Sequence, residues 1–279
     1  MSTSIRTVAL RDNREVPALG LGTWRMGDDA RRRAEELRVI QRSIDLGMTL
    51  IDTAEIYGDG KSERLVGEAI AGRRDEVFLV TKVAPSHATR DGTIRACEAS
   101  LKRLGTEAVD LYLLHWIGGT PVEETIAGFE KLRADGKIRG WGVSNFDTSD
   151  IIDLPKNAAC LADQVLYNPQ SRGVEFSLLP ECTKRGIAIM AYTPLGQNGR
   201  VLRSPVLAAV AERHEATVAQ VALAWVLRHP DVIVIPKTST LARLEENRGA
   251  ADLTLSDADL AEIDRGFSPP RSKRALEML

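Results

Sequence analysis

Short apolar runs recur along the chain, and helical patterns lie between them. Eight of these runs predict strands, at Leu19–Gly22, Thr49–Asp52, Val77–Lys82, Val109–His115, Arg139–Ser144, Leu161–Leu166, Ile187–Tyr192 and Val232–Pro236. Their near-continuous apolar character is typical of parallel strands that are buried on both faces.

The helical patterns between the runs share a stop signal. A glycine ends each of four such patterns: Gly47 ends RRAEELRVIQRSIDLG, Gly105 ends TIRACEASLKRLG, and Gly136 and Gly186 end two others. Glycine is the expected helix stop, because it adopts the left-handed conformation without a side-chain clash. We therefore predict that helices end at these four positions.

The alternation of strands and helices predicts a parallel sheet. Because the repeat is even and contains no reversal, it favours a closed (β/α)8 barrel, the TIM barrel, over a doubly wound sheet. No Pro/Ser-rich linker divides the chain, so we predict a single domain over residues 1–279. The segment TVALRDNREVPAL alternates around Asp12 and Asn13, and this predicts a β-hairpin that plugs one end of the barrel.

The doubly wound alternative can be tested on its fingerprint, GxGxxG between a first strand and a helix. The chain has Gly20 and Gly22, but Arg25 occupies the third glycine position. Any bound dinucleotide must therefore have its phosphates held by something other than a glycine-rich turn.

The composition narrows the range of partners. With 37 basic and 39 acidic residues, the formal charge of -2 offers no general attraction for nucleic acid or anionic membranes. No apolar run approaches the roughly 18 residues of a membrane span, and the start MSTSIRTVAL lacks a signal-peptide core. Cys97, Cys160 and Cys182 are odd in number and form no CxxC pair, which predicts reduced core thiols. We expect a cytoplasmic monomer.

Reactive side chains follow three successive predicted strands. Asp52 ends one strand and Tyr57 lies in the loop after it, Lys82 ends the next strand, and His115 ends the third. In a parallel barrel the loops after the strands build the active site, so these residues should converge. The set supplies a proton donor, a cation and an imidazole but no electron source, which points to a bound cofactor.

Each of these residues also has an ordinary structural interpretation. Asp52 could cap the following helix, and Tyr57 could pack on the surface. Lys82 could be a solvated charge and His115 a core histidine. The coincidence of all four at adjacent strand ends favours a shared site. His214 and His229 lie in helical stretches, where we expect structural roles.

Seven segments then carry a family resemblance. GLGTW, LIDTAEIYG, VTK, LLHW, GKIRGWGVSNF, AYTPLG and IPKT…RLEEN occur in the order in which the aldo-keto reductase family has them. The chain resembles this family over nearly its whole length, and is most similar to short bacterial members, including methylglyoxal reductases. The resemblance implies an eight-stranded barrel that reduces carbonyl compounds with NADPH and uses no metal.

The resemblance also implies the catalytic roles of Asp52, Tyr57, Lys82 and His115. Tyr57 would donate the proton, and a lysine ammonium beside the phenol should pull its pKa down from about 10. Asp52 would pair with Lys82 and spare it the cost of an unpaired buried charge. His115 would donate a hydrogen bond to the carbonyl oxygen.

Cofactor contacts are implied in the same way. The nicotinamide carboxamide would be held by Ser144, Asn145 and Gln164, and its ring would stack on Tyr192. The pyrophosphate side would be covered by Thr193, Pro194, Leu195, Gly196 and Gln197, with Thr23 and Trp24 as further contacts.

The residues after the last predicted strand suit a phosphate. Lys237, Thr238 and Arg243 offer two cations and a hydroxyl beside a helix start, which suits the 2′-phosphate of NADPH. By resemblance, Glu246 and Asn247 would reach the adenine.

The substrate pocket is expected to be open. Trp24 and Trp116 should form its apolar walls, with His87 at its mouth, whereas Ala84 and Pro85 stand where many relatives place a large aromatic residue. Such a pocket suits small aldehydes and 2-oxoaldehydes.

Two other function classes remain open at this stage. Some proteins of this fold are auxiliary subunits of membrane channels that bind NADPH as regulators. A barrel enzyme of other chemistry, such as metal-assisted hydrolysis, would need clustered His and carboxylate ligands, yet His115 is the one His at a predicted strand end.

Overall fold

The computed structural model describes residues 4–197 and 199–279, and within them the eight predicted strands are all present. They form one parallel sheet in which each strand pairs with its neighbours in sequence. The strands are β3 (Leu21–Gly22), β4 (Leu50–Asp52), β5 (Phe78–Val83), β6 (Leu111–Leu114), β7 (Trp141–Ser144), β8 (Cys160–Leu166), β9 (Ala188–Tyr192) and β10 (Val232–Ile235).

Backbone contacts between β3 and β10 close the sheet into a barrel. The N–H of Gly20 donates to the carbonyl of Val234 at 2.9 Å, and the N–H of Val234 donates to Ala18 at 2.7 Å. A parallel bridge also joins Gly22 to Lys237. Within the described residues, closure leaves the eight-stranded sheet without a free edge, and it confirms the barrel over the doubly wound alternative.

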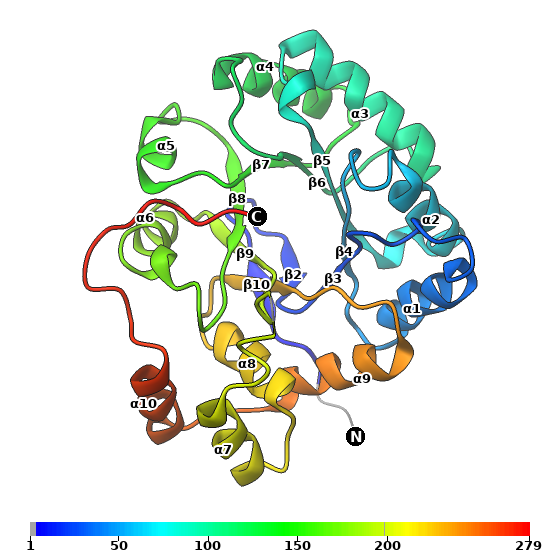
Figure 1. Ribbon diagram of the computed structural model, residues 1–279. Coiled ribbons are helices and arrows are strands. Elements are labelled where there is room, and N and C mark those ends of the chain that lie inside the picture. Colours follow the sequence, from blue (N-terminus) through cyan, green and yellow to red (C-terminus); the bar gives the residue numbers. More distant parts are fainter. Residues whose placement is uncertain (1–3, 198) are drawn as a thin grey trace.

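Helices surround the barrel, as Figure 1 shows. They are α1 (Arg33–Asp45), α2 (Lys61–Ala69), α3 (Arg90–Leu104), α4 (Val122–Ala134), α5 (Thr148–Asp153), α6 (Leu178–Arg185), α7 (Pro205–Arg213), α8 (Val218–Leu227), α9 (Leu241–Gly249) and α10 (Asp257–Gly266). Short 3₁₀ turns lie at η1 (Arg74–Glu76), η2 (Pro85–His87), η3 (Gly173–Glu175) and η4 (Ala250–Asp252). The predicted stops Gly47, Gly105, Gly136 and Gly186 all have positive φ, from 64° to 80°.

The predicted hairpin is formed by β1 (Thr7–Ala9) and β2 (Glu15–Pro17), which pair antiparallel. Val8 and Val16 are buried and belong to the same apolar cluster as Leu50 and Val80 of the barrel strands. The hairpin therefore covers the end of the barrel from which the strands start.

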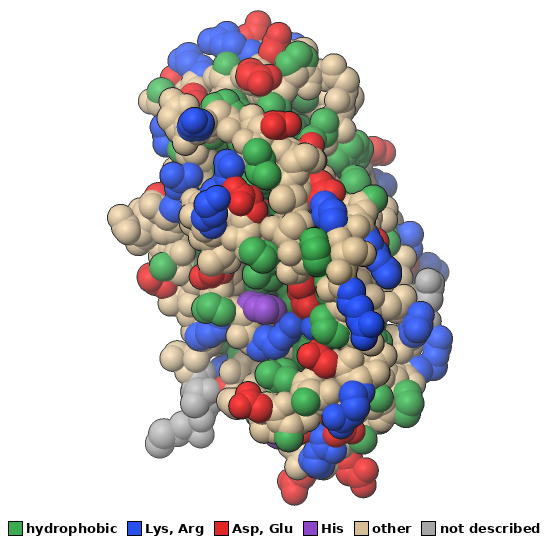
Figure 2. Space-filling view, turned by 90° about the vertical axis from the view of Figure 1, so that its left-hand side faces the viewer, with side chains coloured by type: hydrophobic (Ala, Val, Ile, Leu, Met, Phe, Trp, Pro, Cys, Tyr) green, Lys and Arg blue, Asp and Glu red, His purple; other side chains and the backbone are tan. Residues whose placement is uncertain are grey.

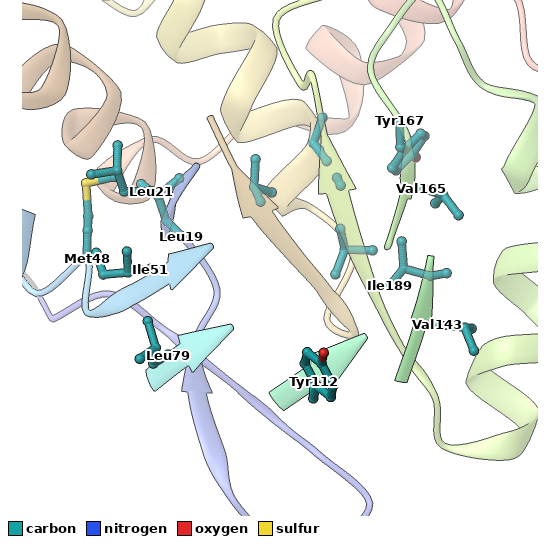
Figure 3. Packing of buried hydrophobic residues seen from close by; sticks show 14 of the residues in the cluster. Leu19, Leu21, Met48, Ile51, Leu79, Tyr112, Val143, Val165, Tyr167 and Ile189 are labelled. Carbon is teal, nitrogen blue, oxygen red and sulfur yellow. The ribbon is translucent and has the colours of Figure 1, made fainter. Parts of the chain in front are cut away.

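Alternation along each strand separates an inner core from an outer one. Leu50 and Val80 belong to the cluster that contacts the hairpin, whereas Ile51 and Leu79 belong to the cluster under the helices. Figure 3 shows this outer packing. The same alternation directs the next inward positions, Asp52 and Lys82, into the barrel.

The remaining sequence predictions concern thiols and charge. The three cysteines are unpaired and buried, and burial raises the pKa of Cys97 to about 12. On the face shown in Figure 2, acidic and basic side chains are interspersed. In the part of the chain that the structure describes, no helix is long and apolar enough to cross a membrane.

Candidate active site

Three strands and one loop deliver the predicted catalytic side chains to the same end of the barrel. Asp52 is the last residue of β4, Lys82 lies near the end of β5, and His115 directly follows β6. Tyr57 lies in the loop between β4 and α2, in a turn where its N–H donates to the carbonyl of Ala54 at 3.1 Å.

Lys82 is the centre of the arrangement. Its Nζ donates to Oδ2 of Asp52 at 2.8 Å, to the carbonyl oxygen of Thr53 at 2.9 Å and to Oη of Tyr57 at 3.3 Å. The lysine side chain is fully buried and the aspartate nearly so. A buried ammonium is tolerable here because a carboxylate and two oxygen acceptors surround it.

The pKa of Tyr57 differs in direction from the sequence expectation. Burial raises it, Lys82 opposes this, and the pKa ends above its ordinary value. For Lys82, burial disfavours the charge, but Asp52 and Tyr57 more than offset this and its pKa is raised. The ammonium does pull the phenol toward phenolate, but desolvation of the phenolate is the larger effect. At neutral pH the site therefore holds a protonated Tyr57 beside a charged Lys82.

His115 is a neutral imidazole. Burial and the nearby Lys82 lower its pKa to about 3. Its ring meets that of Tyr57 edge to face at 5.8 Å and lies 4.8 Å from that of Trp116. Nδ1 is buried and has no hydrogen-bond partner in the described part of the chain. A neutral imidazole carries one N–H, which suits a donor to a carbonyl oxygen.

These side chains lie at a cavity of about 570 Å³ at the carboxyl ends of the strands. Many of the predicted site residues line it: Trp24, Asp52, Tyr57, His115, Trp116, Ser144, Asn145, Gln164, Tyr192, Thr193, Gln197 and Lys237. The structure thus brings together residues from Trp24 near the start of the chain to Lys237 after the last strand.

A polar network forms the part of the cavity wall beside Asp52. Gln164 donates from Nε2 to Oδ1 of Asp52 at 2.8 Å, and Ser144 donates from Oγ to the carbonyl of Gln164 at 2.8 Å. Asn145 has a positive φ of 59° and accepts at Oδ1 from the Tyr192 hydroxyl at 2.9 Å. Amides and hydroxyls held in this way suit a neutral carboxamide, which both donates and accepts.

Several basic side chains lie around Lys237. Lys237 donates from Nζ to Oγ of Ser239 at 2.6 Å. Burial is the largest cause that lowers its pKa; Glu36 and Asp28 oppose the shift, and Arg32 and Arg25 add to it. Arg32 donates to the carbonyl of Ser239 at 3.3 Å. The loop leads directly into α9, whose first N–H groups carry no side-chain cap. Such a combination suits a phosphate group, so the donor set of the cavity fits a phosphorylated dinucleotide.

Some predicted residues lie outside the cavity wall. Those assigned to the cofactor are Thr23, Pro194, Leu195, Gly196, Thr238, Arg243, Glu246 and Asn247. Thr23 is fully buried and donates from Oγ1 to the carbonyl of Asp52 at 2.9 Å. His87 also lies outside the wall, and its Nδ1 is 3.0 Å from Oε1 of Glu55. Lys82 sits behind the wall and reaches the cavity through Tyr57.

The structure also adds residues that sequence reasoning missed. The cavity is lined by Gly22, Arg25, Asp28, Ile56, Gly58, Ile235, Met278 and Leu279. Ile56 and Arg25 could have been found as neighbours of predicted site residues, whereas nothing in the sequence around Met278 signals a site. Ala84, expected at an open wall, is buried instead, and its N–H donates to Glu55 at 2.6 Å.

A metal site needs several His, Cys, Asp or Glu side chains close together. Across 4–197 and 199–279, no three His, Cys, Asp or Glu side chains gather closely enough to hold a metal ion.

Known proteins resemble the chain over almost its whole length. Residues 18–266 match the sequence profile of the Aldo/keto reductase family. Methylglyoxal reductase YeaE of Escherichia coli is 48% identical over 95% of this chain and 95% of its own length, and glyoxal reductase of Bacillus subtilis is 37% identical over 95% and 94%. The crystal structure of an aldo-keto reductase from Klebsiella pneumoniae in complex with NADPH superposes with a TM-score of 0.96 at 46% identity, over 99% of this chain and all of that one.

Proposed function

Because this chain belongs to the aldo/keto reductase family, we propose that it is an NADPH-dependent enzyme that reduces small aldehydes and 2-oxoaldehydes to alcohols. One observation carries the proposal: the buried Lys82 ammonium contacts both the Asp52 carboxylate and the Tyr57 hydroxyl at the wall of the cavity. A phenol placed in this way is equipped to give up a proton to a substrate and to survive briefly as phenolate.

The proton transfer follows from these contacts. NADPH, when bound, supplies the hydride that goes to the carbonyl carbon. Tyr57 donates its proton to the carbonyl oxygen, and Lys82 stabilises the phenolate that remains. Asp52 holds the ammonium in place, and the neutral His115 donates a hydrogen bond to the same carbonyl oxygen while negative charge develops on it.

The cofactor would lie along the cavity between its two kinds of polar groups. Ser144, Asn145 and Gln164 would hold the carboxamide, and Tyr192 would contact the nicotinamide ring. Lys237 would hold the 2′-phosphate, with Thr238 and Arg243 as further contacts from the same loop and helix. Of the remaining predicted contacts, Trp24, Thr193 and Gln197 line the cavity and would meet the cofactor directly, whereas Thr23 and Asn247 would support these segments from behind.

Two kinds of support favour small, electrophilic substrates. The relatives named above are a methylglyoxal reductase and a glyoxal reductase. The wall around Tyr57 contains the apolar side chains of Trp24, Ile56 and Trp116. The indole N–H groups of the two tryptophans are the hydrogen-bond donors that these three side chains could offer to a sugar. Selection should then depend on carbonyl reactivity.

The test is an NADPH-consumption assay with the wild-type chain on methylglyoxal, glyoxal, glucose and a bulky steroid ketone. The two dicarbonyls should be turned over faster than glucose or the steroid. Binding of NADPH without reduction of any of these compounds would contradict the enzyme proposal and favour a regulatory subunit. Selective turnover of the steroid would contradict the proposed substrate class.

A further inference from the structure

Glu55 carries a largely buried carboxylate that the proposed reaction does not use. It lies in the loop between β4 and α2, two residues before Tyr57, and its side chain is 8% exposed. Its Oε1 accepts a hydrogen bond of 2.6 Å from the N–H of Ala84, and Nδ1 of His87 lies 3.0 Å from the same oxygen. The shorter of these two contacts joins the loop of Tyr57 to the main chain directly after β5.

The two segments that Glu55 joins carry the proton donor and the ammonium beside it. Tyr57 belongs to the loop after β4, and Lys82 belongs to β5, so their mutual position depends on how the loop lies on the end of β5. The N–H of Glu55 also donates to the carbonyl of Lys82, but at 3.4 Å, which makes this bond weak. The short bond from Ala84 is the stronger tie, because its acceptor is a carboxylate.

Proton transfer depends on the position of the phenol to a fraction of an ångström. Oη of Tyr57 is 3.3 Å from Nζ of Lys82, which is already long for a hydrogen bond. A catalytic group must be held within about 0.5 Å of its productive position, and a displacement of about 1 Å can cost about a hundredfold in rate. Movement of the loop away from β5 would lengthen this contact and displace the phenol from the carbonyl oxygen of a substrate.

We propose that Glu55 is a positioning residue for proton transfer, because its carboxylate holds the loop of Tyr57 on the end of β5 and so keeps the phenol beside Lys82. Glu55 itself lies outside the cavity wall, so it acts through Tyr57 and not on the substrate. The inference rests on the proposed carbonyl reduction, and it adds a residue on which the rate of that reaction depends.

Three variants separate the length of the side chain from its charge. Burial is the largest influence on the pKa of Tyr57, followed by the charges of Lys82 and Asp52, and Glu55 is not among the causes. The charge of Glu55 should therefore matter little. Glu55→Gln keeps the length and an oxygen that accepts from Ala84, whereas Glu55→Asp keeps the charge but is one methylene too short. Glu55→Ala removes both.

The rate of NADPH oxidation by methylglyoxal is measured in single turnovers, so that product release does not mask the chemical step. Glu55→Ala and Glu55→Asp should lower this rate roughly tenfold to a hundredfold, the range expected for a displaced catalytic group. Glu55→Gln should stay close to the wild type. The Kd for NADPH should be nearly unchanged in all three variants, because other residues would hold the cofactor.

Asp110→Ala is the matched control for loss of stability. Oδ2 of Asp110 accepts a hydrogen bond of 2.9 Å from the N–H of Leu79, so this buried carboxylate also binds the main chain of β5, but near the start of the strand. Its removal should lower the melting temperature and leave the single-turnover rate unchanged. A loss of rate equal to that of Glu55→Ala would show that the rate follows general stability and would overturn the inference.

Amide hydrogen exchange supplies a readout that does not depend on activity. Exchange at residues 53–60 should become faster in Glu55→Ala and Glu55→Asp, because the loop loses its tie to β5, and should stay as in the wild type in Glu55→Gln. If Glu55→Ala does not fold, the comparison of the Asp and Gln variants still decides the question, since each of them retains a polar side chain.

Other results would also overturn the inference. Glu55→Ala could keep the wild-type rate, or Glu55→Asp could be the active variant and Glu55→Gln the impaired one, which would assign the effect to charge. The rate could fall while exchange stays unchanged, or the Kd for NADPH could rise in step with the loss of rate. Failure of the wild type to reduce methylglyoxal would contradict the proposed function itself, and exchange would still report whether Glu55 holds the loop.

Discussion

The Tyr57 hydroxyl experiences two opposed effects on its pKa. Burial raises the pKa and the ammonium of Lys82 lowers it, and burial prevails. A phenol with a raised pKa keeps its proton at neutral pH, as the donor in a reduction must. The phenolate left after transfer is costly in a buried site, and Lys82, 3.3 Å away, offsets that cost when the proton has gone.

The change Tyr57→Phe tests this role at the scale of one atom. It removes the hydroxyl and keeps the ring, so turnover of methylglyoxal should fall about 10²–10⁴-fold, the usual worth of general acid catalysis. The affinity for NADPH should scarcely change, because the carboxamide and phosphate groups would be held by other residues. Steady-state kinetics and a fluorescence titration measure the two effects. A variant that keeps more than about a tenth of wild-type turnover, with chemistry rate-limiting, would exclude Tyr57 as the proton donor.

At the scale of the element, β8 has opposite chemistry on its two faces. Gln164 points into the cavity and donates to Asp52, whereas Asp163 is fully buried on the other side. Oδ1 of Asp163 accepts from the N–H of Phe146 at 3.4 Å, and Oδ2 has no partner in the described residues. Burial raises its pKa well above the ordinary value despite this bond, and Asp150 and Asp147 raise it further. Asp163 therefore remains a neutral carboxylic acid at pH values at which an exposed aspartate has already ionised.

This buried acid predicts a pH-dependent stability. Above about pH 4 the unfolded chain releases the proton that folded Asp163 retains, so stability falls as pH rises toward the raised folded pKa. Asp163→Asn removes this dependence. Its free energy of unfolding at pH 7 should exceed that of the wild type by about 1–3 kcal/mol, and the difference should vanish below about pH 4. Urea denaturation at several pH values measures this, with the exposed Asp153→Asn as the control. If the free energies of unfolding of the wild type and of Asp163→Asn changed with pH in parallel, the prediction would be contradicted.

The loop between β10 and α9 forms the phosphate end of the proposed cofactor site. Lys237 should contact the 2′-phosphate, so Lys237→Met should raise the Kd for NADPH roughly tenfold or more and leave that for NADH nearly unchanged. Added salt should also reduce the preference of the wild type for NADPH over NADH, because it screens the attraction between Lys237 and the phosphate. Lys184→Met, which changes an exposed lysine on α6, is the matched control. If Lys237→Met raised the Kd for NADPH and the Kd for NADH by the same factor, Lys237 would contact a part that the two cofactors share.

At the scale of the whole molecule, closure of the barrel creates the site. Across the closure, the N–H of Gly22 donates to the carbonyl of Pro236 at 3.1 Å. The first and last strands of the barrel therefore contribute to one cavity wall. The hairpin covers the opposite end, which leaves the carboxyl ends of the strands as the open face. The C-terminal segment, residues 268–279, leaves α10, passes α6 and ends beside β8 (Figure 1), and its Met278 and Leu279 line the cavity.

Much of this architecture could be predicted from the sequence, because it depends on local pattern. Apolar runs predict the buried strands, and glycines predict the helix ends; Gly105, for example, has a φ of 64°. The residues Asp52, Lys82 and His115 could be grouped because strand ends of a parallel barrel meet on one face. The resemblance to a family extended these predictions to cofactor contacts, because the chain has the family's sequence segments in the family's order.

The tertiary structure alone decided three features, and each depends on atoms that are distant in sequence. The pKa of Tyr57 is raised because the folded barrel excludes water from it, an effect that the residue type does not encode. Asp52 accepts from Gln164, 112 positions away, which only closure of the barrel permits. The C-terminal segment contributes Met278 to the cavity wall although its sequence has no periodic pattern, because Glu277 beside it accepts a hydrogen bond from Ser171 in the loop after β8. Local pattern determines which elements form, whereas burial and long-range contact determine the chemistry between them.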